Sequence, residues 1–172
     1  ISYKRQRPAL FVGSHQKKEY ALLEIPIKLK GARKPFAHRV LLLDTSAGMK
    51  RRGLKQAVAV CQGLLKRLPK KGRFGLVAGD FKARMYSNAL LPAATSSQTN
   101  GFLSRQRARG ATNLEALFRA GSKLLQEQTD LIYIGDGHAS VGEMDSEQLV
   151  KMVEKAIGSR KIRFSAVAIG PG

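Results

Sequence analysis

The 172-residue chain contains one cysteine, no tryptophan, few aromatic residues and few acidic ones. With Cys61 alone, the sequence excludes an internal disulfide and a zinc site built on several cysteines. Cys61 falls in the apolar stripe of a predicted helix, so we expect a buried, unreactive thiol. No apolar run approaches the ~20 residues that cross a bilayer as a helix, so we expect no membrane insertion of this segment. The chain opens without an initiator Met or a signal-peptide pattern, which indicates a piece of a larger parent chain.

Because acidic side chains are scarce, the net charge is high, and it is unevenly distributed. Lys and Arg number 31 against 12 Asp and Glu, for a net charge of +19. Residues 1–84 hold 21 basic and 4 acidic side chains, a net +17, whereas residues 126–172 hold 5 and 7, a net −2. Such an excess favours polyanionic partners through steering and counterion release. A solvated basic surface, balanced by an acidic neighbour in the parent chain, is the alternative, and the scarcity of aromatic stacking platforms favours it.

The rest of the sequence alternates between strand and helix patterns. Unbroken apolar runs at residues 40–43, 74–78 and 131–134 are typical of parallel strands covered on both faces. Between them, apolar residues at i, i+3, i+4 and i+7 predict amphipathic helices. The alternation predicts a three-layer, doubly wound α/β domain with a mostly parallel sheet at residues 36–172, after an extended arm or linker at residues 1–35. The predicted elements are strands at 20–29, 40–43, 74–78, 82–86, 131–134 and 162–169, a long loop with room for a short helix at 88–110, and helices at 54–68, 114–125 and 149–157, the last running from an Asp145–Gln148 capping box to Gly158.

Polar residues follow two of the apolar strands directly. Asp44 and Asp136 each close a strand, and Ser46 comes two residues after the first of them. Ligands of open α/β sheets bind outside the carboxyl ends of the strands, so these residues are candidates for a site, with Thr112 at the start of a helix nearby. Two carboxylates and two hydroxyls form the hard, all-oxygen environment that Mg²⁺ prefers. Taken singly, Thr112 also fits a helix cap, and the two aspartates fit ordinary turns.

Three loops resemble the metal-ion-dependent adhesion site of von Willebrand factor type A (VWA) domains. Residues 44–49, Asp-Thr-Ser-Ala-Gly-Met, resemble its Asp-x-Ser-x-Ser loop, residues 110–114, Gly-Ala-Thr-Asn-Leu, its Thr loop, and residues 134–137, Ile-Gly-Asp-Gly, its Asp loop. They follow the family's order, and the likeness covers about residues 36–170. The resemblance implies the Rossmann-like VWA fold and a site for Mg²⁺, or for Mn²⁺ or Ca²⁺, held by Asp44, Ser46, Thr112 and Asp136.

The sequence departs from the VWA pattern at Gly48, where the family has its second Ser. Glycine supplies no side-chain oxygen, so we expect a degenerate site with weakened affinity for the ion. Gly48, Lys50, Arg51 and Arg109 are the residues that we expect to line the ligand-binding rim. The positive charge of Lys50, Arg51 and Arg109 disfavours binding of a divalent cation but favours binding of an acidic ligand. The carboxylate of such a ligand would complete the coordination sphere of the ion.

The sequence contains no phosphate-binding Gly-x-x-x-x-Gly-Lys loop, and its three histidines lack the spacing of a zinc site. The resemblance therefore implies a non-catalytic module, which binds an acidic protein ligand through its metal site. It also favours an extracytoplasmic or cell-surface location. Two alternatives stay open: a metal-independent module for polyanions such as glycosaminoglycans or nucleic acid, and a scaffold subunit beside an ATPase.

Two finer expectations come from the same resemblance. Residues 19–26, Glu-Tyr-Ala-Leu-Leu-Glu-Ile-Pro, resemble the join that precedes the VWA domain in inter-alpha-trypsin inhibitor heavy chains and their bacterial relatives. VWA domains usually carry another helix and strand after the segment that matches residues 162–172, so the sequence predicts a domain that is truncated at its C-terminal end.

Overall fold

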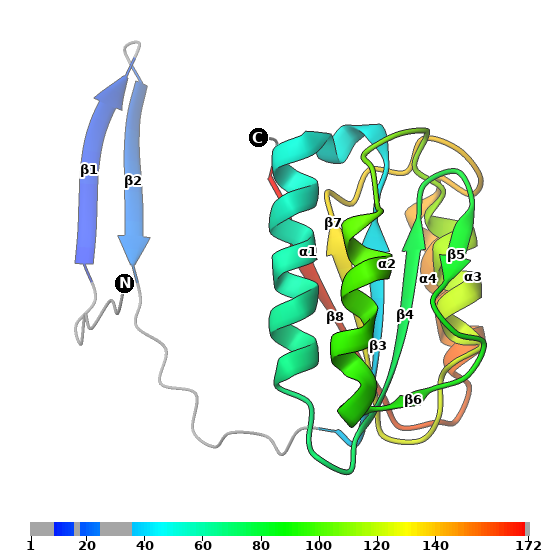
Figure 1. Cartoon of the computed structure of the whole chain (residues 1–172). Coiled ribbons are helices and arrows are strands. Elements are labelled where there is room, and N and C mark those ends of the chain that lie inside the picture. The colour runs from blue at the N-terminus through cyan, green and yellow to red at the C-terminus, as the bar shows by residue number, and fades with distance from the viewer. Residues whose placement is uncertain (1–8, 16–17, 25–35, 171–172) are drawn as a thin grey trace. The chain divides into compact units, whose positions relative to one another are not determined.

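The computed structural model describes residues 9–15, 18–24 and 36–170. The chain forms two compact units, Ile1–Lys34 and Pro35–Gly172, both drawn in Figure 1. No helix in the described ranges is both long and apolar enough to cross a membrane.

The first unit contains a β-hairpin. Strands β1 (Ala9–His15) and β2 (Lys18–Glu24) pair in antiparallel fashion along their whole length. The sequence predicted a single strand at residues 20–29, of which residues 25–29 lie outside the described part of the chain. Strand β1 was missed because its apolar run is interrupted at Gly13 and shows no alternation.

A six-stranded sheet forms the middle of the second unit, from β3 (His38–Asp44), β4 (Arg73–Gly79), β5 (Ala83–Met85), β6 (Leu91–Pro92), β7 (Thr129–Gly135) and β8 (Ile162–Ala168). The strand order is β5-β4-β3-β7-β8, with β6 paired to β4. Strands β3, β4, β7 and β8 run parallel, whereas the short β5 and β6 pair with β4 in antiparallel fashion. The central strands are the apolar runs that the sequence predicted as parallel.

Helices cover both faces of this sheet, as Figure 1 shows. The α-helices are α1 (Lys50–Lys66), α2 (Asn100–Ser104), α3 (Leu114–Ser122) and α4 (Ser146–Ile157), and the 3-10 helices are η1 (Ala47–Met49) and η2 (Ala93–Thr99). Strand β3 explains the layering, because its side chains alternate between two cores. Leu41 and Leu43 pack with α1, and Val40 and Leu42 pack with α3. The predicted three-layer α/β fold with a mostly parallel sheet is therefore confirmed.

Local signals predicted several helix features correctly. Cys61 is fully buried on the inner face of α1, and burial raises the pKa of its thiol to about 12, as expected for an unreactive cysteine. Asp145 caps α4 by accepting hydrogen bonds from the N–H groups of Glu147 and Gln148, and Gly158 ends this helix with a φ of +58°.

Candidate functional site

The carboxyl ends of β3 and β7 bring two carboxylates to one edge of the sheet. Strand β3 ends at Asp44, and β7 ends at Gly135, which Asp136 follows. The two strands pair in parallel with Leu43 opposite Ile134, so their ends lie side by side. Asp44 is fully buried, and Asp136 is half-buried. The two aspartates therefore lie at the edge where α/β folds bind their ligands.

Asp44 is fixed by two hydrogen bonds. The backbone N–H of Ser46 donates to Oδ1 at 2.8 Å, and the Tyr133 hydroxyl donates to Oδ2 at 3.0 Å. The same hydroxyl accepts a hydrogen bond from the N–H of Gly137. Gly135 permits this approach, because a Cβ there would overlap the Tyr133 hydroxyl. Burial raises the pKa of the Asp44 carboxyl, and the hydrogen bond from the Ser46 backbone opposes this rise.

The Ser46 hydroxyl is buried and, among the described residues, has no hydrogen-bond partner. Its oxygen lies 3.8 Å from the point that a Cβ on Gly48 would occupy, and Oδ2 of Asp136 lies 2.6 Å from that point. The other oxygen of Asp136, Oδ1, accepts from the backbone N–H of His138 at 3.0 Å. Two oxygens from the loops that follow β3 and β7 thus face the space beside Gly48. The Ser46 side chain also lowers the pKa of the Asp44 carboxyl, so it lies close to that group as well. A buried hydroxyl without a partner costs about 1–3 kcal/mol, and a ligand or a water that it could bind would remove this cost.

Backbone hydrogen bonds hold the loop that contains Thr112 between the two aspartate loops. The N–H of Ala47 donates to the carbonyl of Gly110 at 2.9 Å, and the N–H of Thr112 donates to the Ser140 hydroxyl at 2.9 Å. Helix α3 is capped by Asn113, whose side chain accepts from the N–H of Ala116. Because Asn113 supplies the cap, the buried Thr112 side chain does not serve as one. The Thr112 hydroxyl forms no hydrogen bond with the Ser46 hydroxyl, because the latter has no partner in the described part of the chain.

The four predicted rim residues are exposed, and they lie in η1, at the start of α1 and in the Thr112 loop: Gly48, Lys50, Arg51 and Arg109. The backbone N–H of Arg109 donates to the carbonyl of Thr45 at 3.0 Å, which ties the two loops together. Their contact with a ligand stays a prediction.

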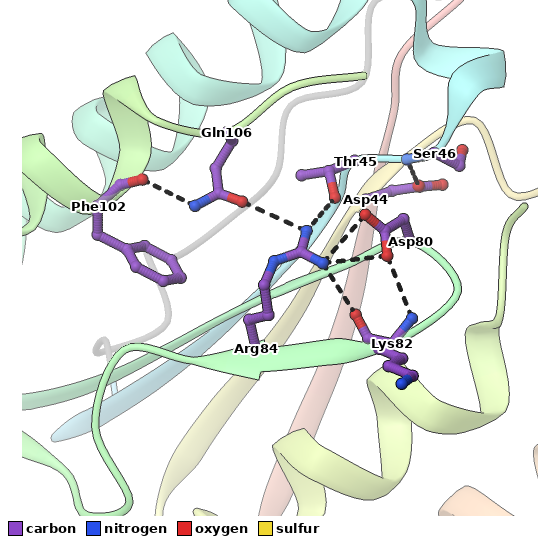
Figure 2. A network of polar contacts seen from close by, with 8 residues as sticks. All are labelled: Asp44, Thr45, Ser46, Asp80, Lys82, Arg84, Phe102 and Gln106. Carbon is purple, nitrogen blue, oxygen red and sulfur yellow. Dashed lines mark hydrogen bonds and ion pairs between the residues drawn. The ribbon is translucent and has the colours of Figure 1, made fainter. Parts of the chain in front are cut away.

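A second carboxylate network, shown in Figure 2, supports the first loop and was not predicted from the sequence. Asp80 follows β4 directly, and it is buried. The Arg84 guanidinium donates to both Asp80 carboxylate oxygens at 3.0 Å and to the Thr45 hydroxyl at 2.9 Å. Burial disfavours the Asp80 carboxylate, but the hydrogen bonds from Arg84 and Lys82 outweigh it and lower the pKa of Asp80. Arg84 therefore clamps the Asp44–Ser46 loop to the end of β4.

The strand-end rule alone could have identified Asp80, because it follows an apolar strand as Asp44 and Asp136 do. Arg84 and Tyr133 carry no comparable signal. Arg84 reaches the loop only because β5 turns back beside β4, and Tyr133 reaches Asp44 only because Gly135 leaves room for its ring.

The side chains gathered at the strand ends carry oxygen atoms of the type that hard cations bind. No cluster of three or more His, Cys, Asp or Glu side chains that could hold a metal occurs in the described ranges. Two carboxylates and two hydroxyls nevertheless lie on loops that are hydrogen-bonded to one another. Among them, the Ser46 oxygen has no hydrogen-bond partner in the described residues and is free to bind an ion. Mg²⁺ takes such oxygens and keeps several waters.

No protein-family model and no curated protein matches this sequence. Solved structures do. A von Willebrand factor type A protein from Catenulispora acidiphila has a TM-score of 0.63 at 19% identity, over 77% of this chain and 32% of that chain. An aerotolerance-related membrane protein from Bacteroides fragilis has a TM-score of 0.62 at 16% identity, over 78% and 68%. The vWF domain of the type V pili tip protein Mfa5 from Porphyromonas gingivalis has a TM-score of 0.50 at 18% identity, over 63% and 40%.

The chain covers 32% of the length of the Catenulispora acidiphila protein and 40% of the length of the Mfa5 domain. At such identities the likeness establishes the fold. The unit Pro35–Gly172 has the VWA fold that the three loops predicted. The finer likeness to inter-alpha-trypsin inhibitor heavy chains stays a prediction, since it depends on residues 19–26, of which 25–26 lie outside the described chain.

Proposed function

We propose that this chain, whose Pro35–Gly172 unit has the VWA fold, is a non-catalytic binding module that recognises an acidic group of a protein ligand through a weakly bound divalent cation. The observation that carries the proposal is the buried Ser46 hydroxyl, which has no hydrogen-bond partner in the described part of the chain and faces, with the Asp136 carboxylate, the space beside Gly48. Ligand sites of α/β sheets lie at this edge. The vWF domain of a pilus tip protein, whose fold this unit shares, supports protein recognition in general.

The four predicted residues have distinct roles in this proposal. The Ser46 and Thr112 hydroxyls would ligate the ion, and the Asp44 and Asp136 carboxylates would hold it directly or through water. When bound, the ion supplies a positive charge that accepts a carboxylate of the ligand. Gly48 contributes no oxygen, so water fills its position and the affinity is low.

The basic rim adds to the selectivity for an acidic ligand. Lys50 and Arg51 begin α1, where the helix dipole is also positive, and no acidic residue lies in this first turn. This field weakens the binding of a cation alone and strengthens the binding of an anionic group. The bound ion and the acidic ligand should therefore stabilise one another.

We propose no catalytic role for this site. A serine nucleophile needs a base within hydrogen-bond distance of its hydroxyl. Among the described residues, none forms a hydrogen bond with Ser46 Oγ. The exposed His138 has its Nδ1 3.9 Å from Oδ1 of Asp136.

Ser46→Ala tests the proposal, because it removes a hydroxyl that the fold itself leaves unsatisfied. In EDTA we expect the melting temperature of the variant to equal or exceed that of the parent. With Mg²⁺ we expect a smaller rise in melting temperature than in the parent, since one ligand is lost. Ser104→Ala is the matched control, because its exposed hydroxyl only donates to the Gly101 carbonyl within α2. Equal Mg²⁺ responses in parent and Ser46→Ala, or no response in the parent, would remove the metal from the proposal.

The high net charge favours a second candidate, a metal-independent module for polyanions. Its support is the net +17 over residues 1–84. Retention of binding in EDTA together with a steep loss in salt would favour this candidate over the first.

A further inference from the structure

A groove of about 630 Å³ lies beside α1, on the α1–α2 side of the sheet seen in Figure 1. One wall is the outer side of the first half of α1, and the other is the end of α2 with the loop that follows it. We call it the α1 groove, and it is lined by Lys50, Arg51, Leu54, Lys55, Val58, Leu103, Ser104, Gln106, Arg107 and Ala108.

The α1 groove combines an apolar floor with a cationic rim. Four of its residues are apolar; Leu54 and Leu103 are buried, whereas Val58 and Ala108 are partly exposed. Four others are exposed cations, Lys50, Arg51, Lys55 and Arg107, and none of the ten lining residues is acidic. The floor stabilises a ligand that buries apolar side chains, and the rim stabilises a ligand that carries negative charge.

We propose that the α1 groove binds an acidic peptide segment of a partner protein, with apolar side chains on the floor and carboxylates against the rim. This surface goes beyond the proposed function, because binding in it needs no cation, although Lys50 and Arg51 also belong to the rim of the strand-end site. An apolar floor offers nothing to a sulfated sugar, and no aromatic residue lines the groove to stack a base. The peptide is therefore the occupant that uses both parts of the groove.

The far wall of the α1 groove is fixed to the strand-end site. Gln106 donates from its Nε2 to the carbonyl of Phe102 at 2.8 Å and accepts from Arg84 at 3.4 Å, and Arg84 also holds the Thr45 hydroxyl (Figure 2). The Arg107 guanidinium donates to the carbonyls of Ser104 and Gln106, both at 2.8 Å. The wall that presents Arg107 is thus preorganised, which lowers the entropic cost of binding.

The probe is a fluorescent 12-residue peptide with eight Asp or Glu and four Leu, and its control carries Ser in place of each Leu. Binding to the full chain is measured by anisotropy in EDTA at low and moderate salt. We expect the Leu peptide to bind more tightly than the Ser peptide, most clearly at moderate salt, where the apolar contribution persists. Binding in EDTA, where the proposed metal site is empty, separates this surface from that site.

The double variant Lys55→Glu, Arg107→Glu should weaken binding of the Leu peptide by about tenfold or more. The double variant Lys123→Glu, Lys151→Glu is its charge-matched control, because both residues are exposed on the other sheet face, Lys123 at the C-terminal end of α3 and Lys151 in α4. It should change binding by less than about threefold. Equal binding of both peptides at moderate salt would overturn the proposal in favour of a polyanion surface. Equal effects of the two double variants, or no binding of the Leu peptide in EDTA, would also overturn it.

Discussion

Gly48 is the residue at which this chain departs from the VWA adhesion-site pattern, and its surroundings explain what a side chain there would meet. Its φ lies outside the left-handed region, so the backbone does not require glycine. A Cβ would lie 2.6 Å from Oδ2 of Asp136, which is the movable end of a side chain. A substitution therefore displaces a predicted metal ligand rather than straining the main chain.

Gly48→Ala and Gly48→Ser form a matched pair. They separate the effect of displacing the Asp136 carboxylate from the effect of adding an oxygen ligand for the ion. Both add the Cβ that pushes Asp136 aside, but only Ser adds an oxygen for the ion. We expect the Mg²⁺-induced rise in melting temperature to be smaller than in the parent for Ala and larger for Ser. A tenfold tighter site gains up to ~1.4 kcal/mol at saturating ion, which corresponds to about 2–4 °C in a domain of this size. The same loss in both variants would contradict the proposed role of the missing hydroxyl.

Asp80 gives a prediction about pH. Its carboxyl pKa is lowered in the folded chain, so it stabilises the fold above the unfolded pKa of an Asp and loses this contribution as the pH falls through the lower folded value. Asp80→Asn should lower the free energy of unfolding at neutral pH by about 1.5–3 kcal/mol, the range for hydrogen bonds to charged groups. Denaturation at a series of pH values should show the gap to the parent closing below about pH 4. A gap that is constant down to pH 2 would contradict this account.

At the scale of the element, we expect the neighbouring residues Thr112 and Asn113 at the start of α3 to have different roles. Asn113 caps the helix, so Asn113→Ala should lower the free energy of unfolding by about 1 kcal/mol, equally in EDTA and in Mg²⁺. Thr112→Val keeps the shape of the side chain and should leave the stability in EDTA nearly unchanged while it reduces the response to Mg²⁺. Chemical denaturation of both variants in the two buffers checks this. A large loss in EDTA for Thr112→Val would indicate a structural role for its hydroxyl.

The elements that the sequence predicted best are those with strong local signals. Strands β3 and β7 contain unbroken apolar runs, and α1 has a continuous apolar stripe. This helix runs from Lys50 to Lys66, whereas the sequence predicted residues 54–68. Helix α3 ends at Ser122, three residues earlier than predicted, although Leu124 and Leu125 are buried as the pattern requires. The N–H groups of these two leucines donate to carbonyls three residues back, so tight turns continue the apolar stripe after the α-helix ends.

Much of the candidate site followed from the parallel sheet, because parallel strands bring their carboxyl ends to one edge. This rule identified Asp44 and Asp136. The orphaned state of Ser46, the contact of Tyr133 with Asp44 and the clamp by Arg84 could not be predicted. They depend on side-chain contacts between segments far apart in the sequence, which no local pattern encodes.

At the scale of the whole molecule, the net charge of +19 predicts non-specific affinity for polyanions. A labelled heparin dodecasaccharide should bind at low salt and weaken by orders of magnitude as the salt rises, if several charges engage. The slope of log affinity against log salt counts the charges that take part. Binding that is insensitive to salt, or absent at low salt, would assign this charge to a solvated surface.

The central claim, that the strand ends hold a divalent cation, is tested most directly by anomalous X-ray scattering from crystals grown with millimolar MnCl₂. We expect one anomalous peak among Ser46, Thr112 and Asp136, and none at this place in crystals of Asp136→Ala. The coordinating oxygens should be mostly waters and hydroxyls, as expected for a site with few carboxylates. A well-ordered strand-end region without an anomalous peak, or with a peak that persists in Asp136→Ala, would contradict the account.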